Sequence, residues 1–260
     1  MISSEVLKKE ESKHSNIFKH IKRISIAILI MLCLVVVAII AWENTSYSCM
    51  QTANKALQSD NKVIVNDGEY ISFTPKDTTP QKGFIFYPGA KVEAESYAPL
   101  CREIAQAGYE VVIAKMPLNF AILGQNEANK IINDYNNINS WAIGGHSLGG
   151  VAASKFASEN DKIKGVALYA SYPSGDELLN SNKEVISIWG SKDNVLNMDS
   201  LKESVNNLPK DTKFIEIEGG NHDQFGDYGA QKGDNKASIS EKEQTDIAAK
   251  NTIELLESIN

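Results

Sequence analysis

The sequence predicts an α/β fold, in which apolar strands alternate with helices along the chain. One observation is a series of short apolar runs typical of buried strands, at 83–87, 109–114, 138–144, 164–170 and 185–189. A second is a glycine-rich motif centred on Ser147 that joins one such strand to a helix-like segment. A third is that Asp193 and His222 each follow a later strand.

The remaining elements complete this pattern in chain order. Two short runs at 63–65 and 70–73 are expected to form an entry pair of strands, and 213–218 is expected to be the last strand. Helices are expected at about 96–107, 127–135, 150–157, 200–208 and 240–258. Gly108 follows the first of these helices as a C-terminal glycine, and Ser240 with Glu243 has the spacing of a capping box at the start of the last.

The motif Gly145-His146-Ser147-Leu148-Gly149 has the G-x-S-x-G pattern of a nucleophile elbow. In such a turn the chain passes sharply from a strand into a helix, and the serine hydroxyl points outward from a strained backbone. Residues two before and two after the serine crowd the turn, and glycine relieves that crowding. We therefore predict that Ser147 is a nucleophile and that the motif is more than a glycine-rich turn without chemistry.

His222 is the predicted general base, because a serine hydroxyl needs a histidine to take its proton. It lies in a loop directly after the predicted strand 213–218. The chain has four histidines, and the others fit the role less well. His14 and His20 precede a long apolar segment, and His146 lies inside the elbow, where we expect it to pack or to hydrogen-bond locally.

Asp193 is the predicted acid that orients this histidine. In elbows of this kind the chain order is serine, then the acid, then histidine. Asp193 lies just past the strand 185–189, where open α/β sheets present functional groups. Asp223 and Asp227 remain alternatives, and Asp199 is instead expected to cap the helix that begins at residue 200.

Two backbone N–H groups are candidates for an oxyanion hole. Leu148 follows the nucleophile at the start of a helix, whose dipole favours a nearby anion. The second donor is expected in the loop 88–92 after the strand 83–87, where Gly89 permits an unusual turn and Ala90 can direct its N–H to the site. Pro88-Gly89 is otherwise an ordinary turn dipeptide.

These residues together resemble the α/β-hydrolase family, most closely its small, lidless dienelactone-hydrolase-like and carboxylesterase-like branch. The likeness covers roughly residues 61–260. One bacterial subgroup of hydrolases is similar in four segments, Tyr87-Pro-Gly-Ala-Lys-Val92, Lys115-Met-Pro-Leu-Asn119, Gly144-Gly-His-Ser-Leu-Gly-Gly150 and Gly219-Gly-Asn-His-Asp-Gln-Phe-Gly-Asp-Tyr-Gly229.

The resemblance implies an eight-stranded, mostly parallel sheet flanked by helices, with no metal or organic cofactor. It implies Ser147 as nucleophile, Asp193 as acid and His222 as base, with Ala90 and Leu148 as oxyanion donors. One feature departs from the family pattern. Dienelactone hydrolase itself uses a cysteine nucleophile, so the serine at position 147 argues against dienelactone as the substrate.

An apolar run from Ile24 to Trp42 precedes all of these elements and contains no charged residue. Nineteen residues at about 1.5 Å each reach roughly 28 Å, enough to cross a hydrocarbon core. Six Lys or Arg residues precede the run and Glu43 follows it, so the positive-inside rule predicts a cytoplasmic N-terminus. A cleaved signal peptide fits less well because the run is long, and a lipoprotein site at Cys49 lacks the usual aliphatic residue before it.

The sequence thus divides into a cytoplasmic basic segment (1–23), a transmembrane signal-anchor (24–42), a polar stalk (43–60) and one α/β domain (61–260). Residues 1–23 carry six basic and three acidic residues, a net +3, which leaves 20 basic and 30 acidic residues, a net −10, for the rest. An acidic outer domain argues against binding nucleic acid. The cysteines at 33, 49 and 101 have no metal-binding spacing, and we expect them to be free.

The connection between the strands 164–170 and 185–189 has only fourteen residues, Ser171 to Glu184. This is too short for a lid domain, so we expect an open, shallow pocket that suits small acyl groups. Phe120, Leu123 and Tyr172 are candidates to line it.

The predicted function is a membrane-anchored serine hydrolase that cleaves ester or thioester bonds through an acyl-enzyme. Its expected partners are a small-molecule acyl substrate and the membrane. Two alternatives remain. One is an acyltransferase or peptidase of the cell envelope that uses the same three residues. The other is a non-catalytic binding module, although such proteins usually lose a triad residue or an elbow glycine, and all of these are present here.

Overall fold

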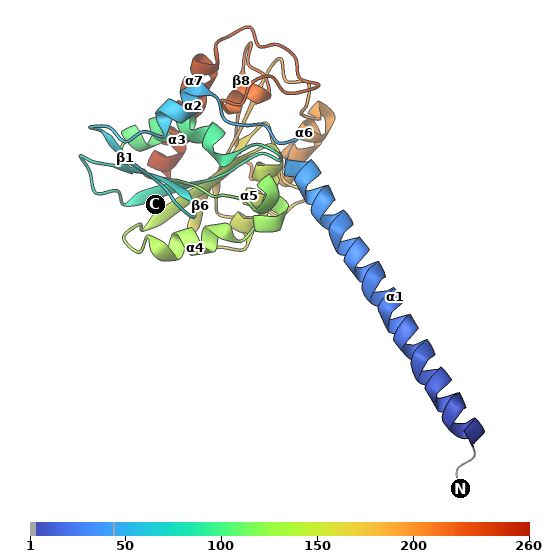
Figure 1. The fold of residues 1–260 in the computed structure, drawn as a ribbon. Coiled ribbons are helices and arrows are strands. Elements are labelled where there is room, and N and C mark those ends of the chain that lie inside the picture. The colour runs from blue at the N-terminus through green and yellow to red at the C-terminus, as the bar shows by residue number, and fades with distance from the viewer. Residues whose placement is uncertain (1–3, 44) are drawn as a thin grey trace. The chain divides into compact units, whose positions relative to one another are not determined.

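The computed structural model describes residues 4–43 and 45–260, which belong to two separate units. The first ends at Thr45 and the second spans Ser46–Asn260. Figure 1 shows the elements of each unit.

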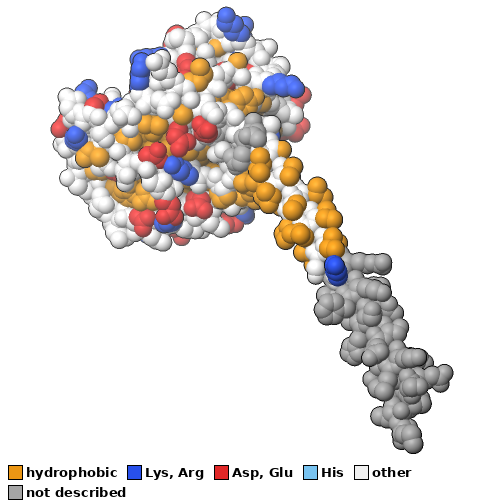
Figure 2. Space-filling view, in the orientation of Figure 1, with side chains coloured by type: hydrophobic (Ala, Val, Ile, Leu, Met, Phe, Trp, Pro, Cys, Tyr) orange, Lys and Arg blue, Asp and Glu red, His pale blue; other side chains and the backbone are white. Residues whose placement is uncertain are grey.

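The first unit contains one helix, α1, from Ser4 to Glu43. Its segment Ile24–Trp42 has a mean hydropathy of 3.3 and is not buried by the rest of the chain. Figure 2 shows hydrophobic side chains along the described part of this helix. The segment is long and apolar enough to be a candidate membrane span, a property that signal sequences near an N-terminus share. Apart from Lys22, the side chains of the predicted basic segment 1–23 lie outside the described residues.

The second unit is built on an eight-stranded sheet with the order β1-β2-β4-β3-β5-β6-β7-β8. The two pairs at the β1 edge are antiparallel and all other pairs are parallel, which confirms the predicted mostly parallel sheet. The strands are β1 (Val63–Asp67), β2 (Ile71–Pro75), β3 (Lys82–Tyr87), β4 (Glu110–Ile113), β5 (Ser140–His146), β6 (Ile163–Tyr169), β7 (Glu184–Gly190) and β8 (Lys213–Ile217).

Helices cover both faces of this sheet (Figure 1). The α-helices are α2 (Gln51–Ala56), α3 (Ala98–Gln106), α4 (Glu127–Asp134), α5 (Leu148–Ser158), α6 (Met198–Ser204) and α7 (Glu241–Ser258). Short 3₁₀ helices are η1 (Ala94–Tyr97), η2 (Pro117–Asn119), η3 (Ala121–Gly124), η4 (Val205–Asn207) and η5 (Asp223–Phe225). Residues 170–183, between β6 and β7, contain neither a helix nor a strand, as expected for a chain without a lid domain.

The alternation of side chains along β3 explains the two layers of the core. Phe84 and Phe86 pack with α3 and α7 on one face, while Ile85 and Tyr87 pack with α4 and α5 on the other. Successive residues of a strand point to opposite faces, so a strand that is buried on both faces has a continuous apolar sequence. This is why the central strands are recognisable as unbroken apolar runs.

Residues 46–60 differ from the predicted polar stalk. The segment Ser46–Ala56, which we call the strap, packs on the rest of the second unit, with Ala53 fully buried. The Tyr47 N–H donates to the Lys91 carbonyl at 2.6 Å and the Tyr47 carbonyl accepts from the Glu93 N–H at 3.0 Å. Hydrogen bonds to loops far along the chain therefore order a segment whose polar composition suggested a stalk, and the folded unit begins at Ser46 rather than at residue 61.

The cap of α6 also differs from the prediction. Asn197, not Asp199, is its N-cap, and its side-chain oxygen accepts hydrogen bonds from the N–H groups of Asp199 and Ser200. At the start of α7 the predicted cap is present, because the Ser240 hydroxyl accepts from the Glu243 N–H at 3.2 Å. Asparagine and aspartate cap helices about equally well, so composition alone does not choose between neighbours.

Candidate active site

Ser147 lies at the turn between β5 and α5 with φ +52° and ψ −123°. An ordinary L-residue rarely adopts this backbone, so the surrounding structure must hold it there. Its N–H donates to the Tyr169 carbonyl at 2.9 Å, and its carbonyl accepts from the Ser171 hydroxyl at 2.7 Å and from the Gly150 N–H at 3.0 Å. The ends of β5, β6 and α5 thus fix the serine in an elbow.

Glycine is required on both sides of this elbow. A Cβ atom placed on Gly145 would lie 2.4 Å from the backbone carbon of Gly149. A Cβ atom on Gly149 would lie 2.2 Å from the Tyr87 carbonyl oxygen. Real Cβ atoms do not approach backbone so closely, and a side chain at either position would have to displace the main chain.

Asp193 and His222 form a buried hydrogen-bonded pair. The imidazole Nδ1 of His222 lies 2.8 Å from Asp193 Oδ2, and both side chains are almost completely inaccessible to solvent. The other carboxylate oxygen accepts from the N–H groups of Val195 and Leu196, each at 2.8 Å. A carboxylate only accepts hydrogen bonds, so Nδ1 carries the proton and Nε2 of a neutral His222 presents its lone pair.

Ser147 and His222 line the same cavity, which has a volume of about 220 Å³. The Nε2 atom of His222 is buried and has no hydrogen-bond partner in the part of the chain that the structure describes. Nε2 is therefore not hydrogen-bonded to the Ser147 hydroxyl, and such bonds are often long before substrate binds. The cavity walls are largely apolar and include Val151, Val195 and Leu196, together with the predicted lining residue Tyr172. Phe120 and Leu123 do not line the cavity.

The alternative carboxylates make other contacts. Asp223 accepts from the Asn221 side-chain amide and the Gln231 N–H, each at 3.0 Å. Asp227 accepts from the Ala53 N–H at 2.6 Å, and Asp199 lies at the exposed start of α6. Asp193 is thus the carboxylate among these four that the structure joins to the His222 ring.

Of the two proposed oxyanion donors, Leu148 lines the cavity at the start of α5, whereas Ala90 is not among the lining residues. The backbone donors around Ala90 are already used. The Gly89 N–H donates to the Tyr97 hydroxyl at 3.0 Å, and the Lys91 N–H donates to the Asn119 carbonyl at 2.8 Å. Within the described residues, the Ala90 N–H is therefore the uncommitted donor of this loop.

Comparison with known proteins assigns the family. The model of the alpha/beta hydrolase family matches residues 83–246, which is more than half of the chain. The chain belongs to the α/β hydrolase family. No curated protein matches it by sequence.

Solved structures of other α/β hydrolases share this fold. Est1E from Butyrivibrio proteoclasticus is 14% identical, with a TM-score of 0.56 over 76% of this chain and 100% of its own. Dienelactone hydrolase from Anabaena variabilis is 13% identical, with a TM-score of 0.57 over 73% and 91% of the two chains. The esterase domain of a Rhodothermus marinus protein is 12% identical, with a TM-score of 0.55 over 74% and 96%. At these identities the comparisons support the fold.

Two side chains of this α/β hydrolase connect its elbow to the loop that holds Ala90. The Tyr97 hydroxyl accepts from the Gly89 N–H and lies 2.9 Å from His146 Nδ1. Within the described residues, His146 Nδ1 is the acceptor within reach of the Tyr97 hydroxyl proton, so we assign Tyr97 as the donor and place the proton of a neutral His146 on Nε2. Burial, and secondly the neighbouring His222 ring, hold the pKa of His146 well below its usual value. His146 is thus a neutral structural group, as its position in the elbow predicted.

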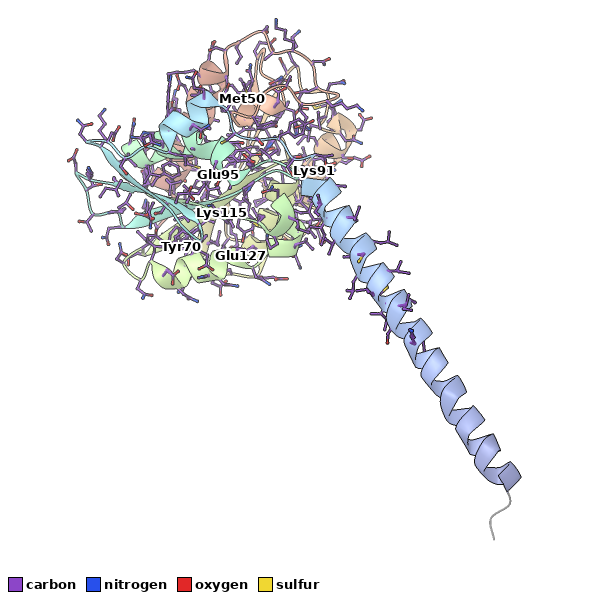
Figure 3. The ribbon with its side chains drawn as sticks, in the orientation of Figure 1. Met50, Tyr70, Lys91, Glu95, Lys115 and Glu127 are labelled. Atoms are coloured by element: carbon purple, nitrogen blue, oxygen red, sulfur yellow. The ribbon has the colours of Figure 1, made fainter. Side chains whose placement is uncertain are left out.

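The strap also contacts two loops of the site. The Tyr47 backbone pairs with the chain at Lys91 and Glu93, directly after Ala90. Further along, the Met50 N–H donates to the Asp227 carbonyl at 2.9 Å, in the loop that follows His222. Met50 and Lys91 are labelled in Figure 3. Sequence reasoning missed these contacts, because no short-range pattern links positions so far apart.

Proposed function

We propose that this α/β hydrolase is a serine hydrolase that cleaves esters or thioesters with short acyl groups. The observation that carries the proposal is the buried His222–Asp193 hydrogen bond beside a cavity that Ser147 also lines. Membership of the family supports hydrolysis. The cavity of about 220 Å³ with its aliphatic walls supports a short acyl chain, because drug-sized ligands occupy pockets of about 300–1,000 Å³.

In the proposed mechanism, the Ser147 hydroxyl oxygen attacks the carbonyl carbon while His222 Nε2 takes the hydroxyl proton. Asp193 holds the imidazole and stabilises the imidazolium. The N–H groups of Leu148 and Ala90 donate to the oxyanion that develops on the carbonyl oxygen. His222 then returns the proton to the leaving alcohol or thiol, and an acyl-serine remains.

Water completes the proposed cycle. His222 removes a proton from a water molecule, whose oxygen attacks the acyl carbon of the intermediate. The second tetrahedral species expels the Ser147 oxygen, which regains its proton from His222. The carboxylic acid product is released, and the enzyme returns to its initial state.

The first test is labelling of the purified full-length protein with a fluorophosphonate probe, which reacts with activated serines. We expect the wild-type protein to be labelled and Ser147→Ala to be unlabelled, with kcat on a short acyl ester reduced by at least about 10³-fold. Ser158→Ala is the matched control and should be labelled like the wild type, because this serine lies at the opposite end of α5 and its hydroxyl donates to the Lys155 carbonyl at 2.8 Å. Labelling that persisted in Ser147→Ala, or a folded wild type that did not react, would contradict the proposal.

We also propose that α1 is an uncleaved signal-anchor with the hydrolase domain outside the cytoplasm. The 19-residue apolar segment and the excess of basic residues before it support this topology. In intact spheroplasts, added protease should digest the domain while an N-terminal tag stays protected. Protection of the domain would overturn this topology, and an isolated protein that begins after Trp42 would show that the anchor is cleaved.

A further inference from the structure

Asp234 lies in the loop between η5 and α7, outside the residues proposed to act on substrate. Its carboxylate accepts four backbone hydrogen bonds. Oδ1 accepts from the N–H of Asn194 at 3.0 Å and from that of Asn235 at 2.9 Å. Oδ2 accepts from the N–H of His222 at 2.8 Å and from that of Asp223 at 3.0 Å. All of the usual acceptor positions of this carboxylate are therefore used.

One of these bonds, from Asn194, joins two loops that come from different strands, and the other three lie within the segment between β8 and α7. Asn194 follows Asp193 in the loop after β7, whereas His222 belongs to the loop after β8. A second contact supports the same junction, because the Asn194 side-chain amide donates to the Gly233 carbonyl at 2.8 Å. The backbone bond from Lys192 to Gly220, at 2.8 Å, joins the loops closer to the strand ends. Asp234 thus joins the backbone of His222 to that of Asn194, the residue after Asp193.

We propose that Asp234 is a positioning residue that holds the backbone of His222 and the backbone next to Asp193 at the separation their hydrogen bond requires. This inference rests on the proposed function, since it concerns the same acid and base. The 2.8 Å bond between His222 Nδ1 and Asp193 Oδ2 sets the orientation of the ring and so the direction of Nε2. A shift of about 1 Å in such a group can cost about 100-fold in rate.

Only a carboxylate fits this position well. An asparagine of the same shape has one acceptor oxygen, and its NH₂ group would face two backbone N–H donors. Asp234→Asn would therefore lose two of the four hydrogen bonds and place donors against donors. The backbone of His222 would shift relative to that of Asn194, within the limits that the Lys192–Gly220 bond sets, while the apolar lining residue Val151 on α5, which has no bond to Asp234, would stay in place.

The test uses the full-length protein in detergent and a short acyl ester. We expect Asp234→Asn to lower kcat by about 10–100-fold and to leave KM within about threefold. The second readout is the proton NMR signal of His222 Nδ1–H, which a strong bond to a carboxylate moves far downfield. We expect this signal to broaden or move upfield in the variant. A residue with a merely structural role would not split kcat from KM or change this signal.

Asp60→Asn is the matched control. Asp60 accepts from the N–H groups of Lys62 and Val63, at 2.8 and 2.9 Å, beside β1. The control removes one negative charge, a comparable backbone acceptor and an ion pair with Arg102, all remote from the site, and it should leave kcat and the His222 signal unchanged. Asp234→Ser takes the place of Asp234→Asn if the amide variant does not fold, with the same expected results.

Wild-type kcat together with an unchanged His222 signal in a folded Asp234 variant would overturn the positioning role. Failure of the proposed function has a different signature. In that case the wild-type protein would neither hydrolyse the ester nor react with the fluorophosphonate. The NMR signal would still report whether Asp234 holds His222 against Asp193.

Discussion

At the scale of single residues, the site depends on hydrogen bonds between buried polar groups. Gly89, Tyr97 and His146 form one such chain, from the loop of Ala90 to the elbow of Ser147. Each of these groups is buried. A buried donor or acceptor that loses its partner costs about 1–3 kcal/mol, so the Tyr97 hydroxyl stabilises two groups that no water can reach.

Tyr97→Phe should therefore reduce both stability and activity. The Gly89 N–H would lose its acceptor and His146 Nδ1 its donor, which should cost about 2 kcal/mol in the free energy of unfolding. Loosening of Gly89 should also misplace the Ala90 N–H and lower kcat/KM by about tenfold. Thermal unfolding and ester hydrolysis measure the two effects.

Tyr169→Phe provides the comparison. The buried hydroxyl of Tyr169 bonds to the Thr252 hydroxyl at 2.6 Å and has no bond to Gly89 or His146. The control should lose similar stability and keep its kcat/KM. Equal losses of activity in the two variants would show that Tyr97 acts only through global stability.

The sequence predicted the proposed catalytic residues because a motif or a strand end marks each of them. Ser147 has glycines at fixed spacing, and Asp193 and His222 follow predicted strands. Asp234 has no such mark, because its donors at Asn194 and His222 are distant in sequence and the fold alone brings them to it. An aspartate in a polar loop is too common to be singled out by composition.

At the scale of elements, the strands were predictable and the strap was not. A strand in the middle of this sheet is buried on both faces, and its apolar run is visible in the sequence. The strap contains only one short helix, α2, whose buried residues are the small Ala53 and Ala56. Its order comes from hydrogen bonds to Lys91, Glu93 and Asp227, which local sequence does not encode.

A chain that begins at Asn61 should therefore be less stable than one that begins at Ser46. The shorter chain loses the pairing of Tyr47 with the Ala90 loop and the bonds from the Arg102 guanidinium to the carbonyls of Ala56 and Gln58. Several lost bonds of about 1 kcal/mol each should lower Tm by about 5–10 °C. Calorimetry of both truncated chains tests this.

The chain that begins at Ser46 is the control. It retains the strap and should unfold at the same temperature as the domain in the full-length protein. Equal Tm values for the two truncated chains would show that the strap only lies on the domain. Residues 46–60 would then act as part of the polar stalk that the sequence predicted.

At the scale of the whole molecule, the stability of the fold should depend on pH through buried carboxylates. Glu110 begins β4 with only 2% of its surface exposed, and the Thr74 hydroxyl donates to it at 2.9 Å. Burial raises its pKa from 4.5 to about 7, an effect that the Thr74 bond only partly offsets. The folded protein therefore favours the protonated carboxyl group.

The contribution of Glu110 to the free energy of unfolding is complete below its unfolded pKa of 4.5 and is lost as pH rises through about 7. Glu110→Gln should remove this loss. The free energy of unfolding of the variant should therefore rise by about 3 kcal/mol relative to that of the wild type between pH 4.5 and pH 8. Denaturant unfolding of both proteins at the two pH values measures the difference. If the difference in unfolding free energy between the two proteins were the same at both pH values, the raised pKa of Glu110 would be contradicted.

The strap finally has a consequence for turnover of the protein. Proteases cut segments that are exposed and can leave the fold locally, and from Tyr47 onward the strap is hydrogen-bonded to the loops of the site. A protease that cut within the strap would need it to detach first, and the product would have a loosened Ala90 loop. A chain that is cut within the strap should thus be a weaker enzyme than the intact chain.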